Sequence, residues 1–415
     1  MRALWLIALL ATAPAFAADE DAAALELADK TATQPERARD WHLFAEAAWS
    51  GVALRAIDAT QQVERLSLGV SFDNVFSPDW RFVFADRFDA WWQQSPSRQY
   101  TVNTLQEAYL SWQPQPNTIA DLGRINTRYG VAYAYNPTDY FRTDAVRATV
   151  SADPAVQREN RLGTVAARGQ ALWNGGSVTA LYSPRLADRP NDIAFDPDFG
   201  ATNNTDRWLV AGSQRLSDQF SPQWLVFGTA GEPPQVGLNA TALLNDATVL
   251  ALEWSGGRSD SLIVQALSLP ADTAFRSRLA ASLTITTADK LSLTAEYHYN
   301  GAALDREHWD GLGRTSPASY ARYRSYAASV QDPPTRHRVF LRAFWQDALV
   351  SHFDLTSYAF IDAVDHSRQF WVEARYHWTR LDLALQWQHN EGSPLSQYGA
   401  LPAKSIVQGL ARYFF

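Results

Sequence analysis

The chain has 415 residues, no cysteine and a formal net charge of −8. Without cysteine it can form neither a disulfide framework nor a thiolate metal site, and its acidic balance argues against nucleic acid as a main partner. Aromatic residues make up 13% of the chain, yet its mean hydropathy is slightly negative. This combination favours a transmembrane β-barrel, which needs aromatic residues at both membrane interfaces while its polar interior lowers the average hydropathy.

The first 17 residues have the features of a secretory signal peptide. A positive charge at Arg2 precedes an apolar run over residues 4–10 and the small-residue pattern Ala15-Phe16-Ala17, so we expect cleavage before Ala18. Residues 18–40 are rich in Ala, Asp and Glu and lack aromatic residues, and we interpret them as a periplasmic tail. No later apolar run is long enough to cross a bilayer as a helix.

From Trp41 onward, apolar and polar residues alternate with a period of two. Segments 41–53, 63–75, 290–300, 337–346 and 370–379 each place an apolar, often aromatic face opposite a polar one. A soluble sandwich also alternates, but it rarely repeats wide aromatic outer faces, because those faces would meet water. We therefore predict an all-β fold over residues 41–415, a closed antiparallel transmembrane β-barrel.

The number of strands follows from counting these segments. About nineteen candidates are present, whereas a single-chain bacterial barrel has an even number. Segments 235–244, 247–255 and 260–268 cannot all span the membrane, so we predict about eighteen strands, with sixteen as the alternative. Either number leaves room for an aqueous lumen. Long outside loops are expected at 126–160, 185–205 and 301–335.

The last eleven residues, Ser405 to Phe415, alternate like a strand and end on an aromatic residue. They resemble the assembly signal of bacterial outer-membrane barrels, which implies recognition of Tyr413 and Phe415 by the barrel assembly machinery. The last strand should also pair with the first, because an open edge in lipid leaves backbone groups unsatisfied.

A second resemblance lies in the stretch that leads into the first long loop. Leu122-Gly123-Arg124, Tyr129-Gly130 and Asn136-Pro137-Thr138-Asp139 resemble a pattern of porin-like outer-membrane barrels related to the alginate exporter. The resemblance implies an antiparallel barrel in the outer membrane of a Gram-negative bacterium, surrounded by lipid. The implied activity is passive passage of a small polar or anionic solute or a polysaccharide.

The loop at 126–160 is a candidate constriction, because loops this long are usually functional or disordered. Asn136-Pro137 favours a turn, and Thr138 or Asp139 could cap a short helix around 140–146. The loop either folds into the barrel or remains a solvated surface loop. The charged residues available for a constriction are Arg128, Asp139, Arg142, Asp144 and Arg147.

Polar strand faces supply the candidate pore-lining residues. Rings of charge set ion preference in a pore, and the number of arginines predicts a weak anion preference. The alternative, to which we give more weight, is that arginines and carboxylates pair across strands and leave no net field. The candidates are Arg81, Arg87, Arg276, Arg278, Arg338, Arg342, Arg375, Glu46, Asp73, Glu107, Glu296 and Glu373.

Enzymatic activity is the less favoured hypothesis. No His-x-x-x-His or Gly-x-Ser-x-Gly motif is present, so we predict no catalytic residues, no metal site and no cofactor. Asp365-His366-Ser367 holds three catalytic residue types, but neighbours on a strand face opposite ways and cannot form a relay. A lipid hydrolase carried by the barrel, or a scaffold that presents loops to partners, remain the alternatives to a channel.

Overall fold

The computed structural model describes residues 40–57, 59–94 and 97–415. The predicted signal peptide and nearly all of the predicted periplasmic tail lie outside the described residues. No helix in the described part of the chain has the length and apolar character needed to cross a bilayer.

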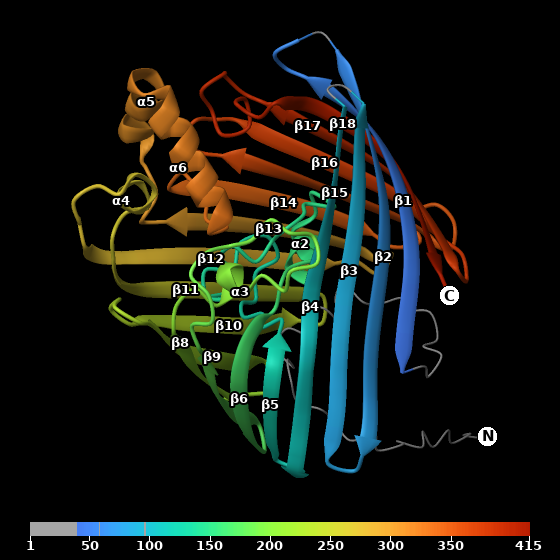
Figure 1. Cartoon of the computed structure of the whole chain (residues 1–415), viewed down its shortest axis with the longest axis vertical. Coiled ribbons are helices and arrows are strands. Elements are labelled where there is room, and N and C mark those ends of the chain that lie inside the picture. The colour runs from blue at the N-terminus through green and yellow to red at the C-terminus, as the bar shows by residue number, and fades with distance from the viewer. Residues whose placement is uncertain (1–39, 58, 95–96) are drawn as a thin grey trace, which may run out of the picture.

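Eighteen antiparallel strands form one closed sheet, in which each strand pairs with its neighbours in sequence and β18 pairs with β1 (Figure 1). The prediction of eighteen strands in a closed antiparallel barrel is confirmed. The strands are β1 (Trp41–Leu54), β2 (Thr60–Ser77), β3 (Trp80–Gln94), β4 (Ser97–Gln115), β5 (Thr118–Ile125), β6 (Thr164–Trp173), β7 (Gly176–Ser183), β8 (Arg207–Gln214), β9 (Phe220–Thr229), β10 (Gln235–Asn245), β11 (Thr248–Ser259), β12 (Ala274–Thr286), β13 (Leu291–Asn300), β14 (His337–Trp345), β15 (Phe353–Asp362), β16 (Arg368–His377), β17 (Leu381–Glu391) and β18 (Ala403–Phe414).

Helices occupy several of the long connections, and α4, α5 and α6 lie beyond the strand ends on the side opposite the tight turns (Figure 1). The helix α4 (Leu262–Leu267) explains why there are eighteen strands and not nineteen. It occupies most of segment 260–268, which is one of the candidate strands predicted from the sequence. The Ser261 side chain caps α4 by accepting a hydrogen bond from the Val264 amide. The helices are α2 (Pro154–Glu159), α3 (Phe199–Thr202), α4 (Leu262–Leu267), α5 (Arg306–Thr315) and α6 (Pro317–Ser329).

Residues alternate between the two faces of each strand as the sequence pattern predicted. On β2, Leu66 and Leu68 are 44% and 47% exposed on the outer face, while the intervening Ser67 is buried inside. The apolar side chains therefore surround the barrel, and the polar ones fill its interior. This is the arrangement of a barrel whose solvent outside is lipid.

The seam between the first and last strands is regular. Glu46 of β1 lies opposite Arg412 of β18, and the Arg412 Nε donates to its carboxylate at 2.7 Å. Tyr413 and Phe415 project outward, 41% and 51% exposed, and the Phe415 amide donates to the Leu43 carbonyl at 3.1 Å. Recognition of these two aromatic residues by an assembly machinery stays a prediction.

Candidate functional site: a loop across the lumen and the cavities on either side

The segment between β5 and β6, residues 126–163, crosses the inside of the barrel and is called here the crossing loop (Figure 1). On one side it contacts the inward faces of β11 and β13 through Glu253 and Glu296. On the opposite side, Arg65 of β2 donates to the Val150 carbonyl at 2.6 Å. The crossing loop therefore spans the lumen from wall to wall.

Glu253 is the main anchor of the crossing loop. Its carboxylate is fully buried and accepts hydrogen bonds from the backbone amides of Val131 at 3.0 Å, Ala132 at 3.3 Å and Thr138 at 2.7 Å. The Asn136 side chain and the Thr138 hydroxyl donate to it as well, at 3.1 and 2.8 Å. A buried carboxylate needs such donors to offset the loss of water.

Gly130 makes this close approach possible. Its φ of 110° lies in the region that favours glycine, and a Cβ at this position would lie 2.6 Å from the Glu253 carboxylate. Tyr129-Gly130 and Asn136-Pro137-Thr138-Asp139 are thus joined in space through one carboxylate on β11. The physical role of these two motifs is to seat the loop.

Glu296 is the second anchor. It accepts hydrogen bonds from the amides of Tyr133 and Ala134 at 2.5 and 3.0 Å, and His298 lies 2.9 Å from the same carboxylate. The Tyr133 ring stacks on Phe340 of β14 at 5.8 Å between centroids. This part of the loop is therefore held by both polar and aromatic contacts.

The expected helix around 140–146 is wrong: these residues form turns, and the helix of the crossing loop is α2. Asp153 caps α2 by accepting from the Ala155 amide at 2.9 Å, and Pro154 occupies its first turn. Thr138 is unavailable as a cap because its amide and hydroxyl both donate to Glu253.

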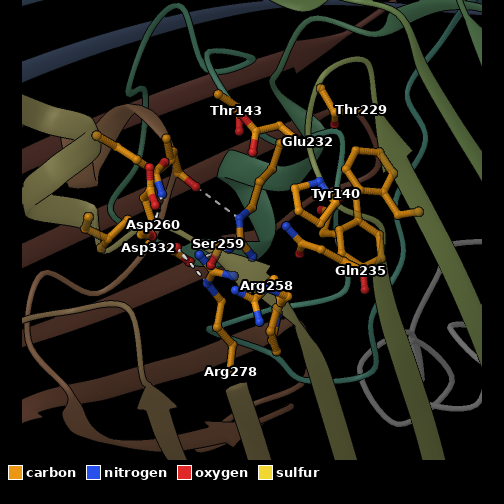
Figure 2. Close-up of a pocket in the computed structure, with 18 of the residues that line it drawn as sticks. Tyr140, Thr143, Thr229, Glu232, Gln235, Arg258, Ser259, Asp260, Arg278 and Asp332 are labelled. Carbon is orange, nitrogen blue, oxygen red and sulfur yellow. Dashed lines mark hydrogen bonds and ion pairs between the residues drawn. The ribbon is translucent and has the colours of Figure 1, made fainter. Parts of the chain in front are cut away.

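A cavity of about 310 Å³ lies on the long-loop side of the crossing loop and is called the outer cavity (Figure 2). Arg258 and Arg278 lie on one side of it, with Tyr140 and Gln235 on the other. Tyr140 stacks on Phe227 at 4.5 Å between centroids, with 3° between the ring planes. Burial raises the pKa of Tyr140 to about 12, so its hydroxyl stays protonated at neutral pH.

Charges in the outer cavity are partly neutralised. Asp332 accepts from Arg142 at 2.5 Å, from the Tyr135 hydroxyl at 2.9 Å and from Arg278 at 3.1 Å. Arg258, in contrast, has no hydrogen bond or ion pair from its side chain to any described residue. One guanidinium is therefore available to a solute in this cavity.

A second cavity of about 620 Å³, the inner cavity, lies between the crossing loop and the tight turns of β6–β9. Three arginines line it, Arg128, Arg168 and Arg215, against one carboxylate, Glu107. Arg168 pairs with Asp121 at 2.8 Å. Arg128 and Arg215 have no hydrogen bond or ion pair from their side chains within the described ranges. The inner cavity is therefore cationic.

A chain of buried polar groups separates the two cavities. The Thr138 hydroxyl lies 2.9 Å from Asn239 Oδ1, and Asn239 Nδ2 donates to Gln223 Oε1 at 2.9 Å. Thr138 is fully buried and Asn239 is 2% exposed, while Gln223 lines the inner cavity. These three side chains join the crossing loop to the walls of β9 and β10.

Six of the twelve predicted pore-lining residues form pairs with each other, and Arg276 pairs with a carboxylate outside this set. Glu46 accepts from Arg87 at 3.0 Å, and Glu373 accepts from Arg375 at 2.9 Å. Asp73 accepts from Arg81 at 2.6 Å, and Arg276 donates to Asp272 at 2.8 Å. These residues therefore follow the second of the two hypotheses, in which arginines and carboxylates pair and leave no net field. Glu107 and Arg278 are the two of the twelve that line the described cavities.

The remaining predicted residues contact the crossing loop or its surroundings. Arg342 lies 4.2 Å from the centre of the Tyr133 ring, and Arg338 donates to His298 at 3.1 Å. Within the crossing loop, Arg128 lines the inner cavity, and Asp139 and Arg142 line the outer one. Asp144 and Arg147 line neither cavity.

Several residues of the site were not predicted from the sequence. Arg168 and Arg215 lie on short strands or turns, and Arg258 lies near the end of β11, where alternation gives no clear face. Glu253 lay in a segment whose status as a strand was open. A carboxylate on the polar face of β11 was the available signal. Among the described residues, no cluster of His, Asp and Glu has the arrangement of a metal site.

No family model and no curated protein matches this sequence. Solved structures do match it. Acinetobacter baumannii OccAB1 is 10% identical with a TM-score of 0.58, and the match covers 90% of this chain and 96% of that one. Pseudomonas aeruginosa OccK2 (OpdF), solved in complex with glucuronate, is 9% identical with a TM-score of 0.55, covering 91% and 97%. P. aeruginosa OccK5 (OpdH) is 8% identical with a TM-score of 0.54, covering 90% and 97%. The chain thus has the eighteen-stranded fold of these outer-membrane channel proteins.

Proposed function

We propose that the protein is an outer-membrane channel for small anionic solutes, chiefly carboxylates. The observation that carries the proposal is the inner cavity, in which Arg128, Arg168 and Arg215 face one lining carboxylate, Glu107, and neither Arg128 nor Arg215 forms a hydrogen bond or ion pair with a described side chain. An arginine side chain offers two parallel N–H donors that match a carboxylate. The channel fold and the glucuronate bound to OccK2 (OpdF) agree with this class of solute.

The two cavities favour a small solute over a polymer. At about 310 and 620 Å³ they have the size of small-molecule sites. The crossing loop spans the lumen between Arg65 and Glu253, so an extended polysaccharide would have to pass this loop. Passage of a polysaccharide therefore stays the less supported form of the channel hypothesis.

Planar-bilayer recording tests the proposal. The wild-type protein should give ohmic conductance steps. In a salt gradient, its reversal potential should lie closer to the equilibrium potential of the anion than to that of the cation. The double variant Arg128→Gln and Arg215→Gln should shift that potential toward cations. Arg185→Gln is the matched control, because Arg185 is exposed and pairs with Asp188 outside the lumen.

Two results would contradict the proposal. If the reconstituted wild-type barrel gives no conductance steps, it is not a channel. If the double variant keeps the wild-type reversal potential, the inner cavity does not select anions. Liposome swelling with glucuronate and with neutral glucose gives an independent measurement, and the proposal expects the ratio of their rates to fall in the double variant.

A further inference from the structure

The barrel wall has a step beside β4. β4 spans Ser97–Gln115, but β5 pairs only with the part from Ala108 to Gln115. The upper part of β4 therefore has no neighbouring strand on this side, and Figure 1 shows β5 ending well below the top of β4. Backbone groups on such an open edge need partners, especially in lipid.

A segment of the 184–206 connection, residues 191–198, occupies this place and is called the wall segment. The Ala194 carbonyl accepts a hydrogen bond from the Asn103 amide of β4 at 3.0 Å. The Phe195 ring stacks on Phe88 of β3 at 5.2 Å, with 3° between the planes. The wall segment thus lies against the outer side of β3 and β4.

The depth of this contact follows from β3. Trp80 and Trp92 lie on the outer face of β3, 39% and 36% exposed, and mark the two interfacial rows of aromatic residues. Trp92 is twelve positions after Trp80, which covers about 30 Å of membrane at about 3.3 Å per residue and about 40° of tilt. Phe88, eight residues after Trp80, lies between the two rows.

Three polar side chains lie on the outer face of the barrel beside this segment. Asp86 of β3 accepts from the Asn103 side chain at 2.8 Å. Arg124 of β5, two residues after the lipid-facing Leu122, donates to the Pro197 carbonyl at 2.5 Å. A charge on the lipid face is costly at this depth. The wall segment contacts two of these residues directly, since Pro197 accepts from Arg124 and Ala194 accepts from the amide of Asn103, whose side chain is the partner of Asp86.

Arg147 of the crossing loop supplies the partners that an irregular backbone needs in the membrane. Its guanidinium donates to the carbonyls of Asn103 at 3.0 Å, Asn191 at 2.9 Å, Ile193 at 3.3 Å and Asp196 at 3.3 Å. Its side chain is 8% exposed. Irregular backbone is tolerated at membrane depth only where such partners exist.

We propose that the wall segment is embedded in the membrane and completes the barrel wall, with Ile193 and Phe195 in contact with acyl chains of the outer leaflet and with Arg147 holding the segment in place. Ile193 and Phe195 are 65% and 72% exposed, and the carbonyls of Ile193, Ala194, Asp196 and Pro197 accept hydrogen bonds. Long loops of such barrels face outside, which assigns the leaflet. The proposal holds for any solute that the channel carries.

Spin labelling tests the proposal, because the chain has no native cysteine. Single variants Ile193→Cys and Phe195→Cys are labelled with a nitroxide in proteoliposomes, and the relative accessibility to oxygen and to a water-soluble nickel chelate is measured. Leu110→Cys is the lipid-facing control on β4, and Leu395→Cys is the control in an outer loop; both leucines are 43% exposed.

We expect positions 193 and 195 to resemble position 110, with high oxygen and low nickel accessibility. Values closer to those of position 395 would overturn the proposal. In the Arg147→Gln background, nickel accessibility at position 193 should rise at least threefold, while position 110 should not change. No rise at position 193 in a folded variant would overturn the role of Arg147.

Discussion

Replacing Glu253 with Gln tests the way the crossing loop is held. The carboxylate accepts five hydrogen bonds, three at Oε2 and two at Oε1, and glutamine keeps one acceptor oxygen and presents an NH₂ group in place of the other. In the better of the two amide orientations, the glutamine oxygen takes the place of Oε2 and keeps three hydrogen bonds, and the two at Oε1 are lost. Hydrogen bonds to charged groups contribute about 1.5–3 kcal/mol each, so the loop should lose about 3–6 kcal/mol.

Hydrogen–deuterium exchange of peptides that cover residues 131–138 measures this loss. About 3 kcal/mol corresponds to roughly 100-fold faster exchange, since 1.4 kcal/mol is a factor of ten. Because the loop can relax and recover part of this loss, we expect exchange at least about tenfold faster than in the wild type. Glu373→Gln is the control, because this inward carboxylate has three hydrogen bonds and none to the loop. Exchange within threefold of wild type in Glu253→Gln would refute the reasoning.

Three further predictions concern the barrier, the terminus and pH. Asn239→Ala should raise single-channel conductance by at least one fifth, because it removes the link between Thr138 and Gln223; an unchanged conductance would mean that this link does not limit the current. Deletion of Phe415 should reduce the folded, heat-modifiable fraction in outer membranes more than twofold on gels, whereas Phe275→Ala, which removes an exposed aromatic residue elsewhere, should not. Burial raises the pKa of Asp153. Between the ordinary pKa of Asp and the raised pKa of Asp153, the folded state binds more protons than the unfolded state. The stability of the crossing loop should therefore rise as the pH falls from the raised pKa toward the ordinary one. Asp153→Asn should remove this part of the pH dependence, and exchange rates measured between pH 4 and 7 check it against wild type.

The fold was predictable because the pattern with a period of two is dictated at every strand by the contrast between lipid and lumen. The strand count was open only where an apolar run fits either a strand or a helix, as in Leu262–Leu267. There the decision depends on Ser261 as a cap and on packing of Leu262 and Ala266 against Trp309 and Tyr323, which are far away in the sequence.

The site was harder to predict, because alternation gives the face of a residue but not its partners. Arg147 was predicted at a constriction. Its guanidinium instead donates to carbonyls of the wall segment, which lies more than forty positions later in the sequence. Glu253 meets amides more than one hundred residues earlier in the chain. Asp86 is a carboxylate on the apolar face of β3, and such an exception to the alternation is the one signal in the sequence for an unusual place in the wall.

The seam between β1 and β18 has a consequence for how the protein is made. Glu46 and Arg412 are separated by 366 positions, so their contact forms only after the whole polypeptide has been synthesised. Contacts of such long sequence separation fold slowly. Until then β1 and β18 each keep an unsatisfied edge, which is prone to aggregation in water. Pairing of β1 with β18 is therefore the contact that depends on the arrival of the last residues of the chain.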